Sequence, residues 1–364
     1  MYSTYQTSLM KIAFLVPYPV GEAPSQRFRF EQYFALLEQK NMHYQVYSFL
    51  DQKTWKILYK PGHALSKIMG IVLGFVKRFL LLFQLSNVDF VFIHREITPI
   101  GPPIFEWIIA KILRKKIIYD FDDAIWIPNT SANNKVVAGI KWHGKVASIC
   151  GWSHKVSVGN AFLRNYALQF NEKVYYNPTT IDTVNLHCQL ANHAVEKPVI
   201  GWTGSHSTMV YLADIVPVIA QLALEYEFDF VVISNKAPDF KLSNLRFIPW
   251  CKATEIHDLA TLNIGIMPLT NDAWANGKCG FKALQYMALG IPALVSPVGV
   301  NEEIVTNNFN GFVCATPSEW KSALESLLLS AANRKRFGEN ARQYIEEKYS
   351  VISNENNFLS LFTE

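Results

Sequence analysis

The stretch Trp274–Gly299, WANGKCGFKALQYMALGIPALVSPVG, decides the fold prediction. Two glycines, Gly277 and Gly280, bracket a turn, and the residues Phe281–Leu289 that follow are predicted to form a helix. The apolar run Ala293–Ser296 then predicts a short buried strand that ends at a Pro-Val-Gly turn. A helix between a glycine turn and a buried strand is typical of an alternating α/β domain.

Two lysines, Lys278 and Lys282, lie at the start of the predicted helix. The helix dipole disfavours cations at this end by about 0.3–1 kcal/mol each, so their position suggests that an anion completes the site. Free N–H groups of a first helical turn commonly bind phosphate, and lysine adds a point charge beside them. The alternative is that both lysines are solvated surface residues.

The same stretch resembles the nucleotide-sugar-binding segment of the family 4 (group 1) retaining glycosyltransferases, on the residues Gln285-Tyr286-Met287-Ala288 and Gly290-Ile291-Pro292. The resemblance implies an α/β protein with the GT-B fold, in which two Rossmann-like domains carry parallel sheets that face a central cleft. It also implies that a nucleoside-diphosphate sugar is the co-substrate and that Gln285 binds the ribose. The family's first motif glutamate falls on Gly277 and is absent. Lys282 places the chain nearest a subgroup with a Gly-Lys-x-x-x-Lys-x-x-Gln/Glu-Tyr-Met-Ala motif.

The composition predicts a folded protein of about two domains, because half of the 364 residues are hydrophobic and 18% are charged. The five cysteines lack metal-ligand spacing, and their odd number predicts a reduced, cytoplasmic protein. The N-terminal residues are not typical of a signal peptide.

The charge is distributed unevenly. Residues 1–116 contain fifteen Lys and Arg and seven Asp and Glu, a net charge of +8, although the whole chain carries only +4. This bias predicts that the N-terminal half meets an anionic surface or substrate. Nucleic acid is not expected as a partner, because no aromatic-interleaved basic motif or nucleic-acid fold signature is present.

The first predicted strand, Ile12–Val16, leads into a turn at Gly21, where ligands of α/β sheets commonly bind. Gly21 is therefore predicted to approach the donor. Arg27 follows at the entry to a helix that extends to about Gln39, and we interpret it as an acceptor-side residue that binds a phosphate or an acidic group. The alternative is a surface arginine on that helix.

Residues Ala64–Ser86 form a mostly apolar helix candidate, interrupted by Lys67, Lys77 and Arg78. Its uncharged runs are far shorter than the ~18 residues that span a bilayer. Basic and aromatic side chains together favour a helix that lies in the interface of an anionic membrane. A buried helix whose lysines extend outward is the competing interpretation.

Polar residues follow two further predicted strands, Val88–Ile93 and Ile117–Tyr119. The carboxyl ends of neighbouring parallel strands share one edge of the sheet, which favours an active site there. We therefore expect catalytic roles for His94, Asp122 and Asp123, and an acceptor-side role for Glu96. Two alternatives remain open, namely an Asp-x-Asp metal site and an aspartate that caps the next helix.

A glycine-containing loop at Gly204 and Ser205 opens the second predicted domain, between a strand and a helix predicted over Met209–Tyr226, as phosphate-binding loops do. Gly299, the last residue of the stretch Trp274–Gly299, resembles the family's glycine turn. The family usually carries an arginine and a lysine just after the loop that corresponds to Gly204 and Ser205, and here neither is present. We expect Lys278 and Lys282 to bind the diphosphate instead, without a metal ion.

The predicted domains are residues 1–185 on the acceptor side, residues 186–345 on the nucleotide-sugar side, and a tail, 346–364, that packs back on the first domain. The predicted function is retaining transfer of a sugar to a glycan or lipid-linked acceptor, in surface polysaccharide assembly at the inner face of the cytoplasmic membrane. A nucleotide-sugar 2-epimerase of the same fold and a catalytically silent glycan-binding subunit are the alternatives.

Overall fold

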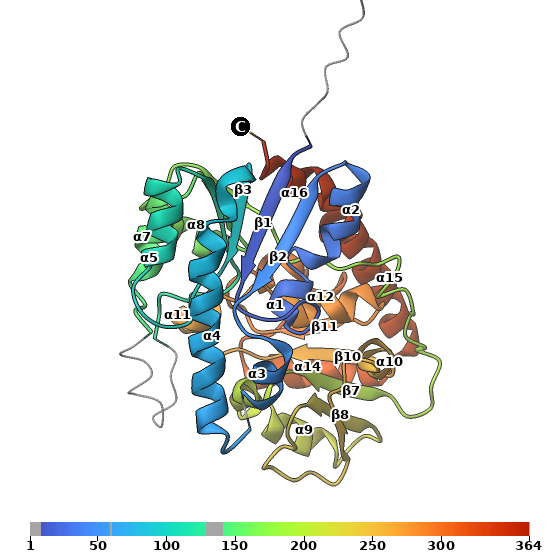
Figure 1. The fold of residues 1–364 in the computed structure, drawn as a ribbon. Coiled ribbons are helices and arrows are strands. Elements are labelled where there is room, and N and C mark those ends of the chain that lie inside the picture. The colour runs from blue at the N-terminus through green and yellow to red at the C-terminus, as the bar shows by residue number, and fades with distance from the viewer. Residues whose placement is uncertain (1–8, 59, 129–140, 364) are drawn as a thin grey trace, which may run out of the picture. The chain divides into compact units, whose positions relative to one another are not determined.

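The computed structural model describes residues 9–58, 60–128 and 141–363, and it divides into two compact units (Figure 1). The first unit comprises Met1–Pro178 together with Glu355–Glu364, and the second comprises Thr179–Asn354. Each unit contains one six-stranded sheet. The prediction of an α/β fold with two parallel sheets is confirmed.

The first sheet has the strand order β2-β1-β3-β4-β5-β6, and all of its pairings are parallel. Continuous apolar runs form these strands, as expected for a parallel sheet that is buried on both faces. The strands are β1 Lys11–Val16, β2 His43–Ser48, β3 Phe90–His94, β4 Lys116–Phe121, β5 Lys155–Val158 and β6 Val174–Tyr176.

Mostly short helices connect these strands, and the longest of them, α4, is the upright blue helix in Figure 1. They are α1 Pro24–Arg27, η1 Glu31–Tyr33, α2 Phe34–Gln39, α3 Gln52–Ile57, α4 Ala64–Leu82, η2 Leu85–Asn87, α5 Ile104–Trp107, η3 Ile108–Ile112, α7 Lys145–Trp152 and α8 Ala161–Ala167.

The second sheet has the order β12-β11-β10-β7-β8-β9 and is also entirely parallel. Its strands are β7 Val199–Thr203, β8 Asp229–Ser234, β9 Leu245–Pro249, β10 Ile264–Met267, β11 Ala293–Val295 and β12 Gly311–Val313. Its helices are η5 His206–Leu212, α9 Val216–Leu222, α10 Glu255–Ala260, α11 Ala273–Asn276, α12 Phe281–Ala288, α13 Asn301–Ile304, α14 Pro317–Leu328, α15 Ala331–Lys348 and η6 Ile352–Asn354.

The last helix, α16 (Glu355–Ser360), belongs to the first unit. Phe358 stacks on Tyr33 with ring centroids 4.2 Å apart. The buried ammonium of Lys155, on β5, donates to the carbonyl oxygens of Ser360 and Thr363 at 2.8 and 2.9 Å. Because these carbonyls end a helix, the cation also complements the helix dipole.

Helix α12 packs closely on β10 because Gly265 lacks a side chain. A Cβ atom at Gly265 would lie 2.3 Å from the ring of Tyr286, which occupies that space. The buried Tyr286 hydroxyl accepts a hydrogen bond of 2.9 Å from the N–H of Thr203 on β7. This contact fixes α12 relative to the end of β7.

Several elements differ from the sequence prediction. The helix expected up to Gln39 is divided into α1, η1 and α2, and the one expected over Met209–Tyr226 is divided into η5 and α9. Proline in the first turn of α9 explains the second division, because proline favours a helix start and cannot donate inside a helix. Strand β4 extends two residues beyond the predicted end at Tyr119. Strand β12 was not predicted.

Candidate functional site

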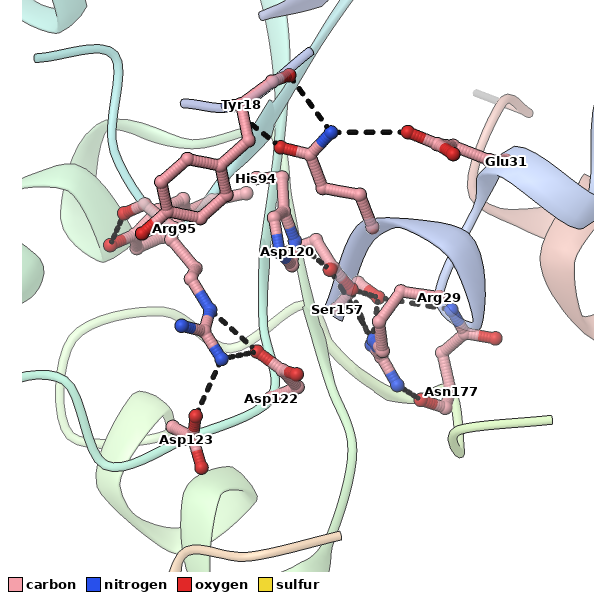
Figure 2. Close-up of polar contacts among 12 residues, drawn as sticks. Tyr18, Arg29, Glu31, His94, Arg95, Asp120, Asp122, Asp123, Ser157 and Asn177 are labelled. Carbon is pink, nitrogen blue, oxygen red and sulfur yellow. Dashed lines mark hydrogen bonds and ion pairs between the residues drawn. The ribbon is translucent and has the colours of Figure 1, made fainter. Parts of the chain in front are cut away.

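A row of buried polar side chains crosses the carboxyl end of the first sheet (Figure 2). His94 on β3 pairs in register with Asp120 on β4, and Asp120 pairs in register with Ser157 on β5. His94 Nδ1 lies 2.8 Å from Asp120 Oδ2, and the Ser157 hydroxyl donates to Asp120 Oδ1 at 2.6 Å. The register of the sheet therefore assembles this row.

Arg29, from the turn after α1, neutralises Asp120. Its guanidinium forms an ion pair with the Asp120 carboxylate and donates to the carbonyl oxygen of Asn177, just after β6. Both side chains of the pair are fully buried. Burial alone would raise the pKa of Asp120, but the Arg29 charge and the His94 hydrogen bond outweigh it, and the pKa lies well below its usual range.

Asp122 and Asp123, which are predicted from the sequence to be catalytic, both pair with Arg95. The Arg95 guanidinium lies 2.7 Å from Asp122 and 2.5 Å from Asp123, and all three side chains are partly exposed. Arg95 adopts a left-handed backbone conformation with φ of 60°, which non-glycine residues rarely do. The alternative Asp-x-Asp motif is divided, because Asp120 pairs with Arg29 whereas Asp122 pairs with Arg95. No group of three or more His, Cys, Asp or Glu suited to a metal ion occurs among the described residues.

The turn at Gly21 is held from within the first unit. The Gly21 N–H donates to Glu31 at 2.8 Å, and Gln26 donates to the same carboxylate at 3.1 Å. The Gln26 amide also exchanges two hydrogen bonds with the backbone of Tyr18. Gly21 has a φ of 79°, a conformation that favours glycine. Its predicted donor contact would therefore use close backbone approach, since its N–H is already bound.

The two predicted acceptor-side residues lie in different surroundings. Glu96 is partly exposed and forms an ion pair of 2.7 Å with Lys145. Arg27 is half-buried, and its guanidinium carbon lies 4.9 Å from the ring centroid of its neighbour Phe28. No contact between Arg27 and Glu96 occurs among the described residues. Their acceptor-side role therefore stays a prediction.

In the second unit, the structure brings Gly204 and Lys282 together. The Lys282 ammonium lies 5.3 Å from the ring centroid of Trp202, at the end of β7. A Cβ atom at Gly204 would lie 2.7 Å from the same ring and 2.8 Å from Lys282 Cε. Gly204, Trp202 and Lys282 therefore form one contact group, which we call the lysine seat. Ser205 follows on the exposed side, with its hydroxyl 2.9 Å from that of Ser207.

Substitution Gly204→Ala is expected to displace Lys282, because the added methyl group has no space between Trp202 and that lysine. Misplacing a binding group by about 1 Å can lower turnover by up to about 10²-fold. Steady-state kinetics would measure this effect. The control is Gly144→Ala, since nothing lies within 4 Å of a Cβ atom there. Equal rates in both variants would show that Gly204 does not position the lysine.

Lys278 and Gly299 border the same end of α12. The Lys278 ammonium lies 5.5 Å from the ring centroid of Trp274. The Gly299 N–H donates to the side chain of Asn276 at 3.1 Å, and a Cβ atom at Gly299 would lie 2.9 Å from the Asn276 carbonyl oxygen. Gly280 begins α12 with φ of 69° and no side-chain cap. The loop after β11 and the turn before α12 are therefore in direct contact.

Gln285, the predicted ribose ligand, is buried on α12 and only 2% exposed. Its amide nitrogen lies 3.5 Å from His187 Nε2, in the segment between β6 and β7. In this arrangement the side chain contacts protein, so ribose binding by Gln285 stays a prediction.

The sequence analysis missed three site residues, Arg29, Ser157 and Trp202, and considered Asp120 only as part of the alternative Asp-x-Asp metal site. Asp120 and Ser157 are polar residues inside apolar strands, and such an interruption indicates a paired or functional side chain. For Asp120 this signal depends on extending β4 to Phe121. Arg29 carried no such signal, because its partner Asp120 lies 91 positions away.

Comparison with known proteins gives a family match for part of the chain. Residues 233–344, within the second unit, match the family described as "Glycosyl transferases group 1". This segment contains α12 and both lysines discussed above. Comparison with curated proteins finds no match.

Solved structures share the fold at low sequence identity. Sucrose-phosphate synthase from Thermosynechococcus elongatus is 12% identical with a TM-score of 0.71, and the match covers 97% of this chain and 98% of that chain. A glycosyltransferase from Rickettsia africae is 14% identical with a TM-score of 0.68, covering 98% of each chain. Anabaena HepE in complex with UDP and glucose is 13% identical with a TM-score of 0.64, covering 96% of this chain and 98% of that one.

These matches extend over both units, and the family match falls on the unit that carries the lysine seat. Residues 233–344 therefore resemble the group 1 glycosyltransferases, and the chain as a whole shares the two-sheet GT-B fold of these solved structures.

Proposed function

We propose that the chain transfers a sugar from a nucleoside-diphosphate sugar to a glycan or lipid-linked acceptor, with retention of configuration, in surface polysaccharide assembly. The observation that carries the donor assignment is the lysine seat, where Lys282 lies against Trp202 and Gly204 at the start of α12. HepE, which is similar in fold, has been solved with UDP-glucose. A uridine nucleotide is therefore the first donor to test.

The chemical problem is the diphosphate, which gains negative charge as the bond to the sugar breaks. Charges and N–H groups that already point at this position stabilise the transition state without reorganisation. We assign this role to Lys278 and Lys282, with the backbone of Ser205. The N–H groups of Gly204 and Gly299 already donate to Ile233 and Asn276, so these two glycines are assigned close backbone approach to the donor. The lysines supply the positive potential that a divalent ion would otherwise provide, so no metal is proposed.

On the first unit, we assign the sugar end of the reaction to His94, Asp122 and Asp123. Asp122 and Asp123 share one arginine, which holds both carboxylates in fixed positions. Gly21 borders the same sheet edge, while Arg27 and Glu96 stay assigned to the acceptor. An enzymatic nucleophile is not assigned, which agrees with front-face transfer.

Binding of UDP is expected to raise the melting temperature, because a ligand of the folded state stabilises it by mass action.

Turnover of UDP-sugars with a panel of glycan and lipid-linked acceptors should then persist in excess chelator. Activity that vanishes with chelator and returns with magnesium or manganese would contradict the metal-free assignment. Conversion of the nucleotide sugar without acceptor would identify an epimerase, and tight binding without any turnover would identify a silent subunit.

We further propose that α4 binds the anionic inner face of the cytoplasmic membrane. One face of α4 and the residue after it expose large apolar side chains, from 45% exposed at Leu73 to 84% at Leu65. The apolar stripe consists of Leu65, Ile68, Met69, Val72, Leu73, Val76, Phe79, Leu80 and Phe83. A stripe of this size on a protein surface usually marks a binding site. None of the described helices is long and apolar enough to cross a membrane.

The face of α4 turned to the protein is unusual, because glycines and an arginine form it. A Cβ atom at Gly70 would lie 2.2 Å from Thr54, and one at Gly74 would lie 2.6 Å from the ring of Phe49. Arg78 is 2% exposed. The prediction that Arg78 meets an anionic surface is wrong, since its guanidinium is directed inward to backbone carbonyls. Lys77 beside it is exposed and remains available.

Co-sedimentation with vesicles tests the membrane proposal. The wild type is expected to bind phosphatidylcholine vesicles that contain phosphatidylglycerol, and less so at high salt. Ile68→Glu/Val76→Glu should abolish binding, because each buried aliphatic side chain contributes about 1.5–3 kcal/mol. The control is Val210→Glu/Leu224→Glu, which makes two such changes at positions 68% and 87% exposed in the second unit. Failure of the wild type to bind, or equal binding by the stripe variant, would overturn the proposal.

A further inference from the structure

The hydrogen-bonding state of His94 can be derived from its partner. An ionised carboxylate only accepts hydrogen bonds, so the 2.8 Å contact requires a proton on His94 Nδ1. Asp120 stays ionised because Arg29 is paired with it in the same buried cluster. The remaining ring nitrogen, Nε2, is buried and has no hydrogen-bond partner among the described residues.

The charge balance of the cluster favours a neutral imidazole. Arg29 and Asp120 already cancel, and both are fully buried. A second cation at His94 would add an uncompensated buried charge, which is costly. Glu31 also interacts electrostatically with His94, and burial raises the pKa of its carboxyl. Glu31 also has its own donors, the Gly21 N–H and the Gln26 amide.

We infer that Asp120, oriented by Arg29 and Ser157, is a positioning residue that holds His94 as the neutral Nδ1–H tautomer, so that Nε2 presents a bare lone pair. A group bound at that nitrogen must therefore donate a hydrogen bond, as a sugar hydroxyl does, and cannot be an anion such as phosphate. The tautomer assignment holds whatever the reaction is. The statement about sugar hydroxyls rests on the proposed function.

The tautomer is measurable without substrate. Long-range ¹H–¹⁵N NMR of the labelled full chain distinguishes the two neutral tautomers and the imidazolium, and the His94 signals are assigned by their loss in His94→Asn. We expect a protonated Nδ1 and an unprotonated Nε2 at neutral pH. An imidazolium or an Nε2–H tautomer in the wild type would overturn the inference.

Two variants test whether Asp120 causes this state. In Asp120→Asn the new amide can donate to Nδ1, so the proton is expected to move to Nε2. Ser157→Ala is the matched control, because it removes a bond to the other carboxylate oxygen and should leave the tautomer unchanged. An unchanged tautomer in a folded Asp120→Asn protein would remove Asp120 from the positioning role. If that variant does not fold, the wild-type spectrum still decides the tautomer.

Kinetics separate function at Nε2 from a purely structural pairing with Asp120. Glutamine places its amide near the position of Nε2, whereas asparagine places its amide near Nδ1. If Nε2 binds a substrate hydroxyl, His94→Gln should retain about tenfold more turnover than His94→Asn, the value of roughly one hydrogen bond. The opposite order would show that His94 serves only as a partner of Asp120. If both NMR predictions hold while no sugar is transferred, the proposed function fails and the tautomer assignment stands.

Discussion

Replacing Lys282 by alanine is expected to lower the turnover number about 10²–10³-fold while the protein stays folded, as the loss of one preorganised charge does at comparable sites. Lys282 is half-buried and lies against Trp202, at the start of a helix whose first turn has no side-chain cap. Its contribution should grow as the diphosphate gains charge, so the loss should fall on kcat rather than on KM alone. Steady-state kinetics with a UDP-sugar would measure kcat and KM, and circular dichroism would show whether the variant stays folded.

Lys335→Ala provides a matched control for this substitution. Lys335 lies on α15 of the same unit, its side chain is 71% exposed, and its only recorded ion pair in the described chain is with Glu339, one helical turn away. It is expected to keep the wild-type rate. Near-wild-type kinetics in Lys282→Ala, in Lys278→Ala and in the double variant would contradict the assignment of the diphosphate to these lysines.

Arg78→Met is expected to destabilise the first unit by at least about 1.5–3 kcal/mol, the value of a hydrogen bond to a charged group, out of the 5–15 kcal/mol that stabilises a typical domain. The Arg78 guanidinium donates to the carbonyl oxygens of Val16, Tyr47 and Ile97 at 2.7, 2.8 and 3.0 Å. These oxygens lie at or just after the ends of three neighbouring strands. Methionine fills similar volume but cannot donate, so the three oxygens lose the guanidinium as a partner, although that of Val16 still accepts from the Phe49 N–H.

Urea unfolding followed by circular dichroism would measure this loss. The control is Lys77→Met, because Lys77 is the preceding residue and is exposed, so its replacement should change the free energy of unfolding by less than about 0.5 kcal/mol. Equal stability of the two variants would show that the three carbonyl contacts of Arg78 contribute little.

The strands were the most predictable part of the fold. The sequence predicts strands over Lys155–Val158 and Val174–Tyr176, and these are the bounds of β5 and β6. Short apolar runs between turn residues are typical of buried parallel strands. The end of β4 was missed for a related reason. Asp120 interrupts the apolar run, and a carboxylate is compatible with a buried strand only when a distant cation such as Arg29 neutralises it.

The sites were predictable only where the signal was local. Lys282 and Gly204 were identified from a helix start and a glycine loop, and the structure brings them together. The orientation of α4 was not predictable in the same way. Its 3.6-residue periodicity separates an apolar stripe from a face of glycines, but it does not show that the glycine face is the one turned to the protein.

The apolar stripe of α4 also has a consequence for handling the purified chain. Nine large apolar side chains in water favour association with any other apolar surface, including the same stripe on a second copy. Without lipid, two copies would bury these stripes against each other as the protein concentration rises. The size of the particle in solution would then depend on whether detergent is present, and an apparent dimer in plain buffer would report an uncovered helix rather than a native assembly.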